Sequence, residues 1–341
     1  MLRTPICDLL GLKYPVFQGG MAHLATGALA AAVSEAGGLG IIGAGNAPAT
    51  WVKEQIDYVR AHTDKPFGVN VMLASPHARD VIELLVSERV PVVTTGAGNP
   101  GPYMEALKSA NSLVIPVVSA VALAQRLVRA GADAVIAEGT ESGGHVGELT
   151  TMALVPQVVD AVSVPVIAAG GIADGRGVAA AFCLGAQGVQ VGTRFIVARE
   201  CIAHPNYKAA VLAAGDRDTV VTGRATGHPV RCLRNRLARE FIKLEERGAS
   251  LDEYERLGAG RYPAAALAGD VERGTVLLGQ IAGLVRREET AAEILADLIA
   301  GAEAVLAALP ARLNLAAAGR AGAAPDGREA TAIAAEASAK E

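Results

Sequence analysis

Short apolar segments alternate with longer amphipathic segments along the first 192 residues of the chain. The apolar segments begin about 25 residues apart, which is the length of one strand-helix unit. Between them, residues 49–62 and 121–132 repeat apolar positions at intervals of three and four, as amphipathic helices do. The apolar segments show no polar face, which is typical of parallel strands covered by helices. The pattern predicts an α/β protein with a parallel TIM (β/α)8 barrel. The strands are expected in "YPVFQGG", "LGIIGAG", "PFGVNVM", "PVVTTGAG", "LVIPVV", "DAVIAEG", "VPVIAAGG" and "QGVQVGT".

The pattern changes after the eighth apolar segment. Residues 199–285 are rich in arginine and glycine, with few strand signals, and "VRCLRNRLAREFIKLEE" is predicted to form a helix. We therefore expect a barrel over residues 1–198, then a small helical domain over 199–285 that covers the barrel mouth. A C-terminal helix, residues 286–311, should return to the barrel. Residues 312–341 are mainly alanine, glycine and charged residues with few large apolar side chains, and are predicted to be a disordered tail.

Composition narrows the function. About half of the residues are apolar and the formal net charge is -4, with acids and bases interspersed. Such a chain has no broad basic field for nucleic acid or an anionic membrane. The first 17 residues lack a signal-peptide pattern, and no unbroken apolar run has membrane-spanning length. The four cysteines show no metal-ligand spacing and are expected to be thiols in a reducing compartment. We expect a cytoplasmic protein that acts on small molecules.

Residues 37–46, "GGLGIIGAGN", contain the spacing G-x-G-x-x-G. A dinucleotide-binding fingerprint places these glycines after a strand and at the start of a helix, with an acidic residue about 20 positions later. Here Gly37 and Gly38 end a predicted helix, and "LGIIG" is itself the strand. We therefore interpret the match as part of the second barrel strand.

Glycine turns follow the last two predicted strands. Gly170 and Gly171 come after the seventh strand, and Gly192 and Thr193 follow the eighth. Phosphate groups commonly bind at these two positions of a TIM barrel, because bare backbone N–H groups can approach the oxygens. The turns predict a ligand that carries a phosphate, although the glycines could also serve only to make tight turns.

His145 lies in the loop after the sixth strand, "EGTESGGHVGELTT". The surrounding glycines, Gly143 among them, allow close approach of a ligand, and the ring is a titratable group at the catalytic end of the barrel. His145 is therefore the predicted functional histidine. His62 and His77 are expected at the surface, whereas His23, His204 and His228 are weaker candidates for the pocket.

Small polar groups end the remaining strands. A flat heteroaromatic ring needs polar groups along one edge, which Asn46, Asn70, Glu138 and Gln190 could supply, although each also suits the capping of a turn. Gly20, Met21 and Ala22 offer small or flexible groups beneath the ring. Together these residues favour a planar cofactor with a phosphate tail. Because no carboxylate cluster has metal-ligand spacing, no catalytic metal is expected.

Several of these segments closely resemble the bacterial flavin-dependent enoyl-acyl carrier protein reductase II family. They include "YPVFQGGMA", "SEAGGLGIIGAGNAP", "GADAVIAEGTESGGHVGELTTM", "VPVIAAGGIADGRG" and "GAQGVQVGTRF". "AHPNYK" and "GQIAGLVRREETAAEIL" extend the likeness to about residue 305. Nitronate monooxygenases, of the 2-nitropropane dioxygenase superfamily, are broader relatives that share the barrel and the FMN.

The resemblance implies a TIM barrel that binds FMN and reduces the 2,3 double bond of enoyl thioesters with NADH or NADPH, in fatty-acid synthesis. By position, Gly170, Gly171, Gly192 and Thr193 match the phosphate-binding turns, and His145 matches the catalytic histidine. Gly20, Met21, Ala22, Asn46, Asn70 and Glu138 match the surroundings of the ring and ribityl chain. The resemblance also implies a response to a monovalent cation, whose site has no assignment in this sequence.

The implied protein substrate is an enoyl-acyl carrier protein, which is acidic. Arg231, Arg234, Arg236 and Arg239 are candidates for contacting it at the cleft mouth, with ordinary surface charge as the alternative. The helices of the barrel also permit a homodimer. The main alternative function is the oxidation of nitronates, with His145 as a base. A third is a flavin-binding barrel that stores or senses FMN without turnover.

Overall fold

The computed structural model describes residues 2–313. Eight parallel strands form one sheet in the order β1-β9-β8-β6-β5-β4-β3-β2, which confirms the predicted TIM barrel. The seam between β1 and β2 is closed by hydrogen bonds from Gln18 N to Leu39 O and from Leu39 N to Val16 O, 3.0 and 2.9 Å long. The strands are β1 (Val16–Gln18), β2 (Gly40–Gly43), β3 (Phe67–Met72), β4 (Val92–Gly96), β5 (Leu113–Val118), β6 (Val135–Glu138), β8 (Val166–Ala169) and β9 (Gly188–Val191).

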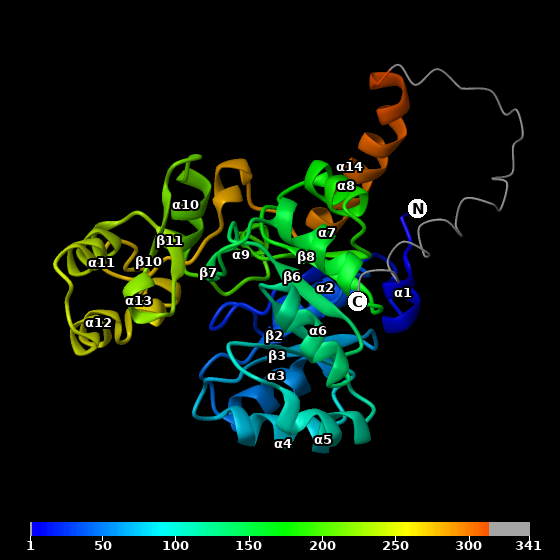
Figure 1. Ribbon diagram of the computed structural model, residues 1–341, viewed down its shortest axis with the longest axis horizontal. Coiled ribbons are helices and arrows are strands. Elements are labelled where there is room, and N and C mark those ends of the chain that lie inside the picture. Colours follow the sequence, from blue (N-terminus) through cyan, green and yellow to red (C-terminus); the bar gives the residue numbers. More distant parts are fainter. Residues whose placement is uncertain (1, 314–341) are drawn as a thin grey trace, which may run out of the picture.

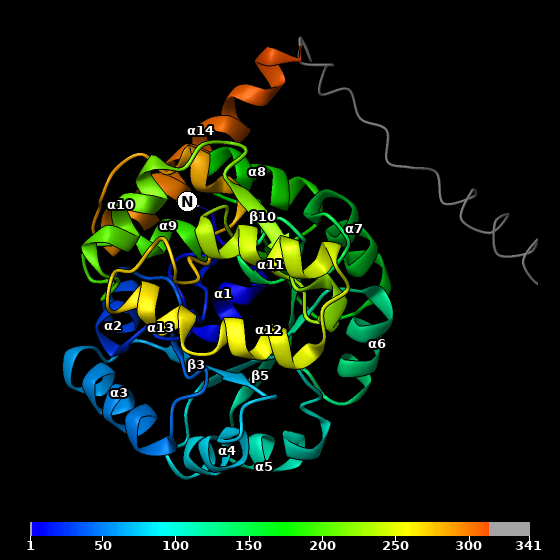
Figure 2. The ribbon, with the colours of Figure 1, turned by 90° about the vertical axis from the view of Figure 1, so that its left-hand side faces the viewer.

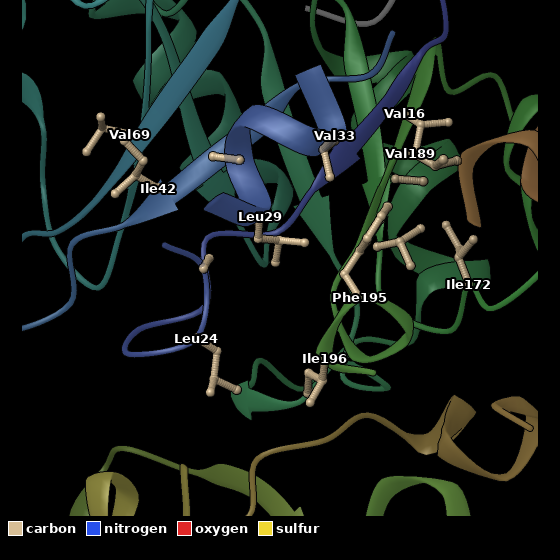
Figure 3. Close-up of a cluster of buried hydrophobic side chains, with 14 of the residues drawn as sticks. Val16, Leu24, Leu29, Val33, Ile42, Val69, Ile172, Val189, Phe195 and Ile196 are labelled. Carbon is tan, nitrogen blue, oxygen red and sulfur yellow. The ribbon is translucent and has the colours of Figure 1, made fainter. Parts of the chain in front are cut away.

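Helices surround this ring of strands, and α1 lies at its amino end (Figure 2). Alternate side chains of each strand point inward and outward, as the pleat requires. Ile41 and Ile136 belong to the cluster inside the barrel, whereas Ile42 and Val69 pack outward against the helices (Figure 3). The helices are α1 (Pro5–Leu10), α2 (Gly27–Glu35), α3 (Ala49–His62), α4 (Ala78–Ser87), η1 (Gly101–Tyr103), α5 (Met104–Ser109), α6 (Val121–Arg129), α7 (Thr151–Ala161), α8 (Gly175–Cys183) and α9 (Thr193–Ile196).

The glycines of the G-x-G-x-x-G spacing serve packing. A Cβ atom at Gly40 would lie 1.8 Å from the carbonyl oxygen of Ala30 in α2, and one at Gly43 would lie 2.5 Å from that of Met21. Because real atoms do not approach so closely, only glycine lets α2 and the β1–α2 loop lie against β2.

Residues 199–285 form a lobe beside the carboxyl ends of the barrel strands (Figures 1 and 2). Its helices are α10 (Pro205–Ala213), η2 (Arg224–Thr226), α11 (Arg236–Glu246), α12 (Leu251–Gly258), α13 (Arg261–Ala266) and η3 (Gln280–Leu284). The lobe also holds two strands, β10 (Thr219–Thr222) and β11 (Val230–Leu233), which join β7 (Gly144–His145) in a three-stranded antiparallel sheet.

The prediction that a helix begins at Val230 was wrong. Val230–Leu233 is strand β11, and α11 begins only at Arg236, because Asn235 caps it by accepting a hydrogen bond from Ala238 N. The Asn235 amide also donates to the carbonyls of Val271 and Gly274, both at 2.7 Å. β11 pairs with β10 across a long loop, residues 223–229, and with the distant β7, so no short hairpin turn marks the strand.

The C-terminal helix α14 (Ala291–Arg312) packs its first half against α8 and α2 of the barrel, and its second half extends outward (Figure 1). By length and composition alone this helix could cross a membrane. Its contacts explain the apolar residues of the first half: Ile294, Leu295 and Leu298 are fully buried. Of the tail predicted over 312–341, residues 314–341 lie outside the described residues.

Candidate active site

A cavity of about 510 Å³ lies at the carboxyl ends of the barrel strands. Loops of the barrel form most of its wall, and Tyr262, Leu277 and Ile281 contribute to it from the lobe. The volume is in the range usual for small-molecule and cofactor sites. The predicted site residues that line it are Gly20, Met21, Ala22, Asn70, Glu138, Gly143, His145, Gly170, Gly171, Gln190, Gly192 and Thr193.

Asn46 is the exception, and its predicted place at the cavity was wrong. Its side chain is exposed, and the preceding Gly45 lines the cavity instead. Gly45 has φ +53°, so the chain turns there in a conformation that favours glycine. A Cβ atom at Gly45 would lie 2.6 Å from that of Ala22, so the turn also packs tightly on the β1–α2 loop.

The β1–α2 loop lies against β3 at Gly20. A Cβ atom at Gly20 would lie 2.2 Å from the Cβ atom of Asn70, which no side chain can accommodate. The Asn70 amide donates a 2.9 Å hydrogen bond to Thr94 Oγ1, so its second N–H and its carbonyl oxygen are left to contact a ligand. Gly20 is therefore required for the backbone of this loop to border the cavity beside Asn70.

The predicted phosphate turns offer free donors. Gly170 and Gly171 have φ +87° and +74°, and within residues 2–313 the backbone N–H groups of Gly170, Gly171 and Gly192 donate to no acceptor. A Cβ atom at Gly192 would meet only Met21 Sδ, at 3.9 Å. Because these three glycines line the cavity, their N–H groups can donate to an anionic ligand bound there.

The His145 ring faces the same cavity from β7. The backbone there is fixed to the lobe, because His145 pairs with Val230 of β11 and Val146 N donates to Pro229 O at 3.0 Å. His145 is exposed on its outer side, but the cavity loops partly desolvate its ring; this desolvation, followed by the nearby His228, lowers the pKa of His145 below its usual value. At neutral pH the ring is therefore mostly uncharged, with one N–H donor and one free acceptor.

Comparison with known proteins identifies the family. The model of the family described as nitronate monooxygenase matches residues 3–84 and 79–301. The chain belongs to the nitronate monooxygenase family. This is a family of FMN-dependent oxidoreductases, so the enzyme class and the flavin predicted from the sequence are confirmed at family level.

Three proteins illustrate the range of similar family members. FabK from Thermotoga maritima, a solved structure, is 48% identical, with a TM-score of 0.89 over 92% of this chain and 100% of that one. A carboxyl-CoA dehydrogenase of Mycobacterium tuberculosis, acting on a hydroxy-methyl-oxo-octahydroindene ring system, is 42% identical over 70% of this chain and 68% of its own. A protein described as a probable nitronate monooxygenase of Staphylococcus aureus is 35% identical over 82% of this chain and 91% of its own.

The cavity fits the FMN of the nitronate monooxygenase family. The turns at Gly171 and Gly192 offer unpaired N–H groups for the phosphate. The Thr193 hydroxyl accepts a 2.8 Å hydrogen bond from Gly279 N and keeps its own proton to donate. Asn70, Gln190 and the β1–α2 loop border the same cavity. These donors suit a phosphate tail and a planar ring.

Glu138 and Glu141 add two carboxyl groups to this family site. Burial raises the pKa of Glu138 to about 7. The Glu141 carboxylate accepts hydrogen bonds from Thr151 N at 2.9 and 3.0 Å and from Thr151 Oγ1 at 3.0 Å. Glu141 thereby caps helix α7, and its acidic charge suits that helix end.

Sequence reasoning missed several cavity residues of this family member. Glu141 and Tyr262 carried no motif, and His228 was only a weak candidate, yet all three line the cavity. Tyr262 lies on α13, in the lobe, where no sequence pattern shows which barrel loop it will contact. His204, another weak candidate, accepts from Asn206 N and caps α10 instead.

The four arginines predicted at the cleft mouth do not form one group. Arg231 is only 7% exposed, and its guanidinium donates to Thr140 O at 3.0 Å and to Thr219 Oγ1 at 3.1 Å. It cannot contact a protein partner and instead holds the loop that carries His145. Arg234, Arg236 and Arg239 are exposed.

Proposed function

We propose that this protein is a cytoplasmic NAD(P)H-dependent enoyl thioester reductase of the FMN-binding type, with an enoyl-acyl carrier protein as substrate. The observation that carries the proposal is that one cavity joins unpaired phosphate-type turns at Gly171 and Gly192 to an imidazole, that of His145. The 48% identity to FabK favours this activity over the others in the family. The name of the Mycobacterium relative, a carboxyl-CoA dehydrogenase, also points to thioester substrates.

The chain's own residues would bind the cofactor, orient the substrate and protonate it. Gly170, Gly171 and Gly192 would hold the phosphate, and Asn70 and Gln190 would contact the ring edge. When bound, FMN supplies the hydride carrier between NAD(P)H and the β-carbon of the substrate. His145 would hold the proton that reaches the α-carbon, so that one hydride and one proton saturate the double bond.

The cavity also has an apolar region suited to an acyl group. Met72, Val117, Leu123 and Val146 line it on the side of β3 and β5 and beside His145. Burial of methylene groups against such side chains stabilises binding by about 0.8 kcal/mol for each CH₂. We expect an apolar acyl portion of the thioester to lie there.

Nitronate oxidation is the second candidate, favoured by one observation. The lowered pKa of His145 leaves a neutral imidazole at pH 7, which suits a base that removes a proton from a nitroalkane carbon. The Staphylococcus relative described as a probable nitronate monooxygenase is consistent with this chemistry.

An anaerobic experiment separates the candidates. NADH or NADPH is added to purified flavoprotein and the absorbance of oxidised flavin is followed. Crotonyl thioester or a nitronate is then added in turn. Bleaching by NAD(P)H followed by reoxidation with the thioester alone supports the reductase. Absence of bleaching, together with nitronate turnover in oxygen, would replace it with the monooxygenase. Flavin that responds to none of these would indicate storage or sensing.

A further inference from the structure

A second histidine stands beside His145. The ring centroids of His145 and His228 are 6.5 Å apart and the ring planes meet at 87°. Both residues line the same cavity. This separation is longer than a direct hydrogen bond between two imidazoles allows, and it leaves room for one bridging water.

The backbone fixes this pair in place. His228 follows Gly227, a left-handed residue with φ +75°, at the end of the η2 turn. Two residues later Val230 pairs with His145 in the β11–β7 ladder, and Pro229 O accepts from Val146 N. His145 therefore lies on β7, and His228 lies in the loop two residues before the strand that pairs with it.

Most of the other titratable groups around His145 are engaged elsewhere or lie in solvent. On β11, Arg231 donates to Thr140 O and Thr219 Oγ1. On the loop that precedes β7, Glu141 accepts from Thr151. Across the cavity, Tyr262 of α13 donates to Ala22 O. Glu138 of β6 also lines the cavity, and burial raises its pKa. Glu148, further along the same loop, is exposed to solvent.

We propose that His228 is a positioning residue that governs when His145 carries its proton. Two imidazolium ions at this distance repel, so a proton on His228 disfavours a second one on His145. Both His145 and His228 are exposed, so both rings can exchange protons with solvent. This inference deepens the proposed function, and its kinetic part rests on that function.

The test measures the titration of His145 in the holoenzyme by NMR, with ¹³C-labelled histidine and resonances assigned from single His variants. His228→Asn should raise the titration midpoint of His145 by about 0.5 to 1 pH unit, from the Coulomb energy of two charges at 6.5 Å in water-like surroundings. His228→Lys, which keeps a positive charge, should leave the midpoint at or below that of the wild type. His228→Glu should raise it further than His228→Asn.

His62→Asn is the matched control, because His62 is an exposed histidine on α3, outside the cavity lining. It should leave the His145 midpoint unchanged. Identical midpoints in the Asn, Lys and Glu variants would overturn the proposal. Because three charges are compared at one exposed position, a folding defect in one variant does not decide the result.

The kinetic part uses crotonyl thioester. If His145 delivers the proton, kcat/KM falls as the pH rises through its midpoint, and this limb should move in parallel with the NMR midpoint across the variants. A wild type that does not reduce the thioester, with the NMR order intact, would reject the reductase function and leave the histidine coupling standing. A kinetic limb that stays fixed while the midpoint moves would reject the catalytic part of the proposal.

Discussion

The Tyr262 hydroxyl donates a 2.7 Å hydrogen bond to the carbonyl oxygen of Ala22, although the two residues are 240 positions apart. Tyr262 belongs to α13 of the lobe, and Ala22 to the β1–α2 loop of the barrel. The Tyr262 ring also packs edge-on against His23, whose φ of +63° marks the bend of this loop. With the β7–β11 ladder, this bond ties the lobe to the barrel at a second place along the cavity.

Replacing Tyr262 with Phe should weaken FMN binding. The substitution removes one hydrogen bond and keeps the ring, so the Ala22 carbonyl loses its partner and the loop beneath the ring is less fixed. A hydrogen bond contributes about 0.5–1.5 kcal/mol, which predicts a rise in the FMN Kd of about 2- to 13-fold. Fluorescence titration of deflavinated protein with FMN measures this Kd. Tyr58→Phe is the control, because Tyr58 is an exposed residue of α3, and it should leave the FMN Kd unchanged. An unaltered Kd in both variants would show that the Tyr262–Ala22 hydrogen bond does not support FMN binding.

The barrel could be predicted from sequence because its signals are local. Strands apolar on both faces, such as β2 and β8, are short runs bounded by glycine, and the phosphate turns follow them directly. The Tyr262–Ala22 bond and the β7–β11 pairing could not be predicted, because they depend on where the lobe folds back onto the barrel. Asn46 was misplaced for a related reason: the turn at Gly45 decides which way its side chain faces.

Arg194 should be a large contributor to stability. Its guanidinium donates to Glu289 at 2.9 Å, to Asp297 of α14 at 2.7 Å and to Ala173 O at 2.9 Å, and the Arg194 and Glu289 side chains are 9% and 8% exposed. Arg194→Ala leaves the buried Glu289 carboxylate paired with the exposed Arg287. We therefore expect a loss of about 3–5 kcal/mol in the free energy of unfolding.

Urea denaturation of the holoenzyme measures this loss. Arg79→Ala is the control, since Arg79 pairs with Glu83 on the exposed face of α4, and it should leave the free energy of unfolding nearly unchanged. Equal small losses in both variants would show that the Arg194 network contributes no more than a surface ion pair.

Glu138 should make the protein less stable as the pH rises. Its pKa is about 7 in the folded chain, against a usual value of 4.5, so the folded state holds this proton more tightly than the unfolded state. The stabilisation is complete below pH 4.5 and is lost as the pH rises towards 7, by on the order of 1–3 kcal/mol. The difference in unfolding free energy between the wild type and Glu138→Gln, measured in urea at pH 5 and pH 8, isolates this effect. A difference that does not change with pH would mean that Glu138 titrates normally.

His145→Ala should separate flavin binding from substrate reduction. His145 lies on the cavity wall, on the short strand β7, and is not part of a phosphate turn. Its removal therefore leaves the Gly171 and Gly192 donors in place. We expect the variant to retain FMN and to be bleached by NAD(P)H at a rate close to that of the wild type. Reoxidation by crotonyl thioester should slow by about 10²- to 10⁴-fold, the range for loss of a general acid.

Stopped-flow absorbance under nitrogen measures both steps of the His145→Ala reaction separately. Asn46→Ala is the control, because Asn46 is exposed and does not line the cavity, so both steps should match the wild type. Wild-type reoxidation by the thioester in His145→Ala would assign the proton to another group. Loss of the flavin itself would instead mean that the β7–β11 sheet supports the cofactor, and the slow step would then be restored by excess FMN.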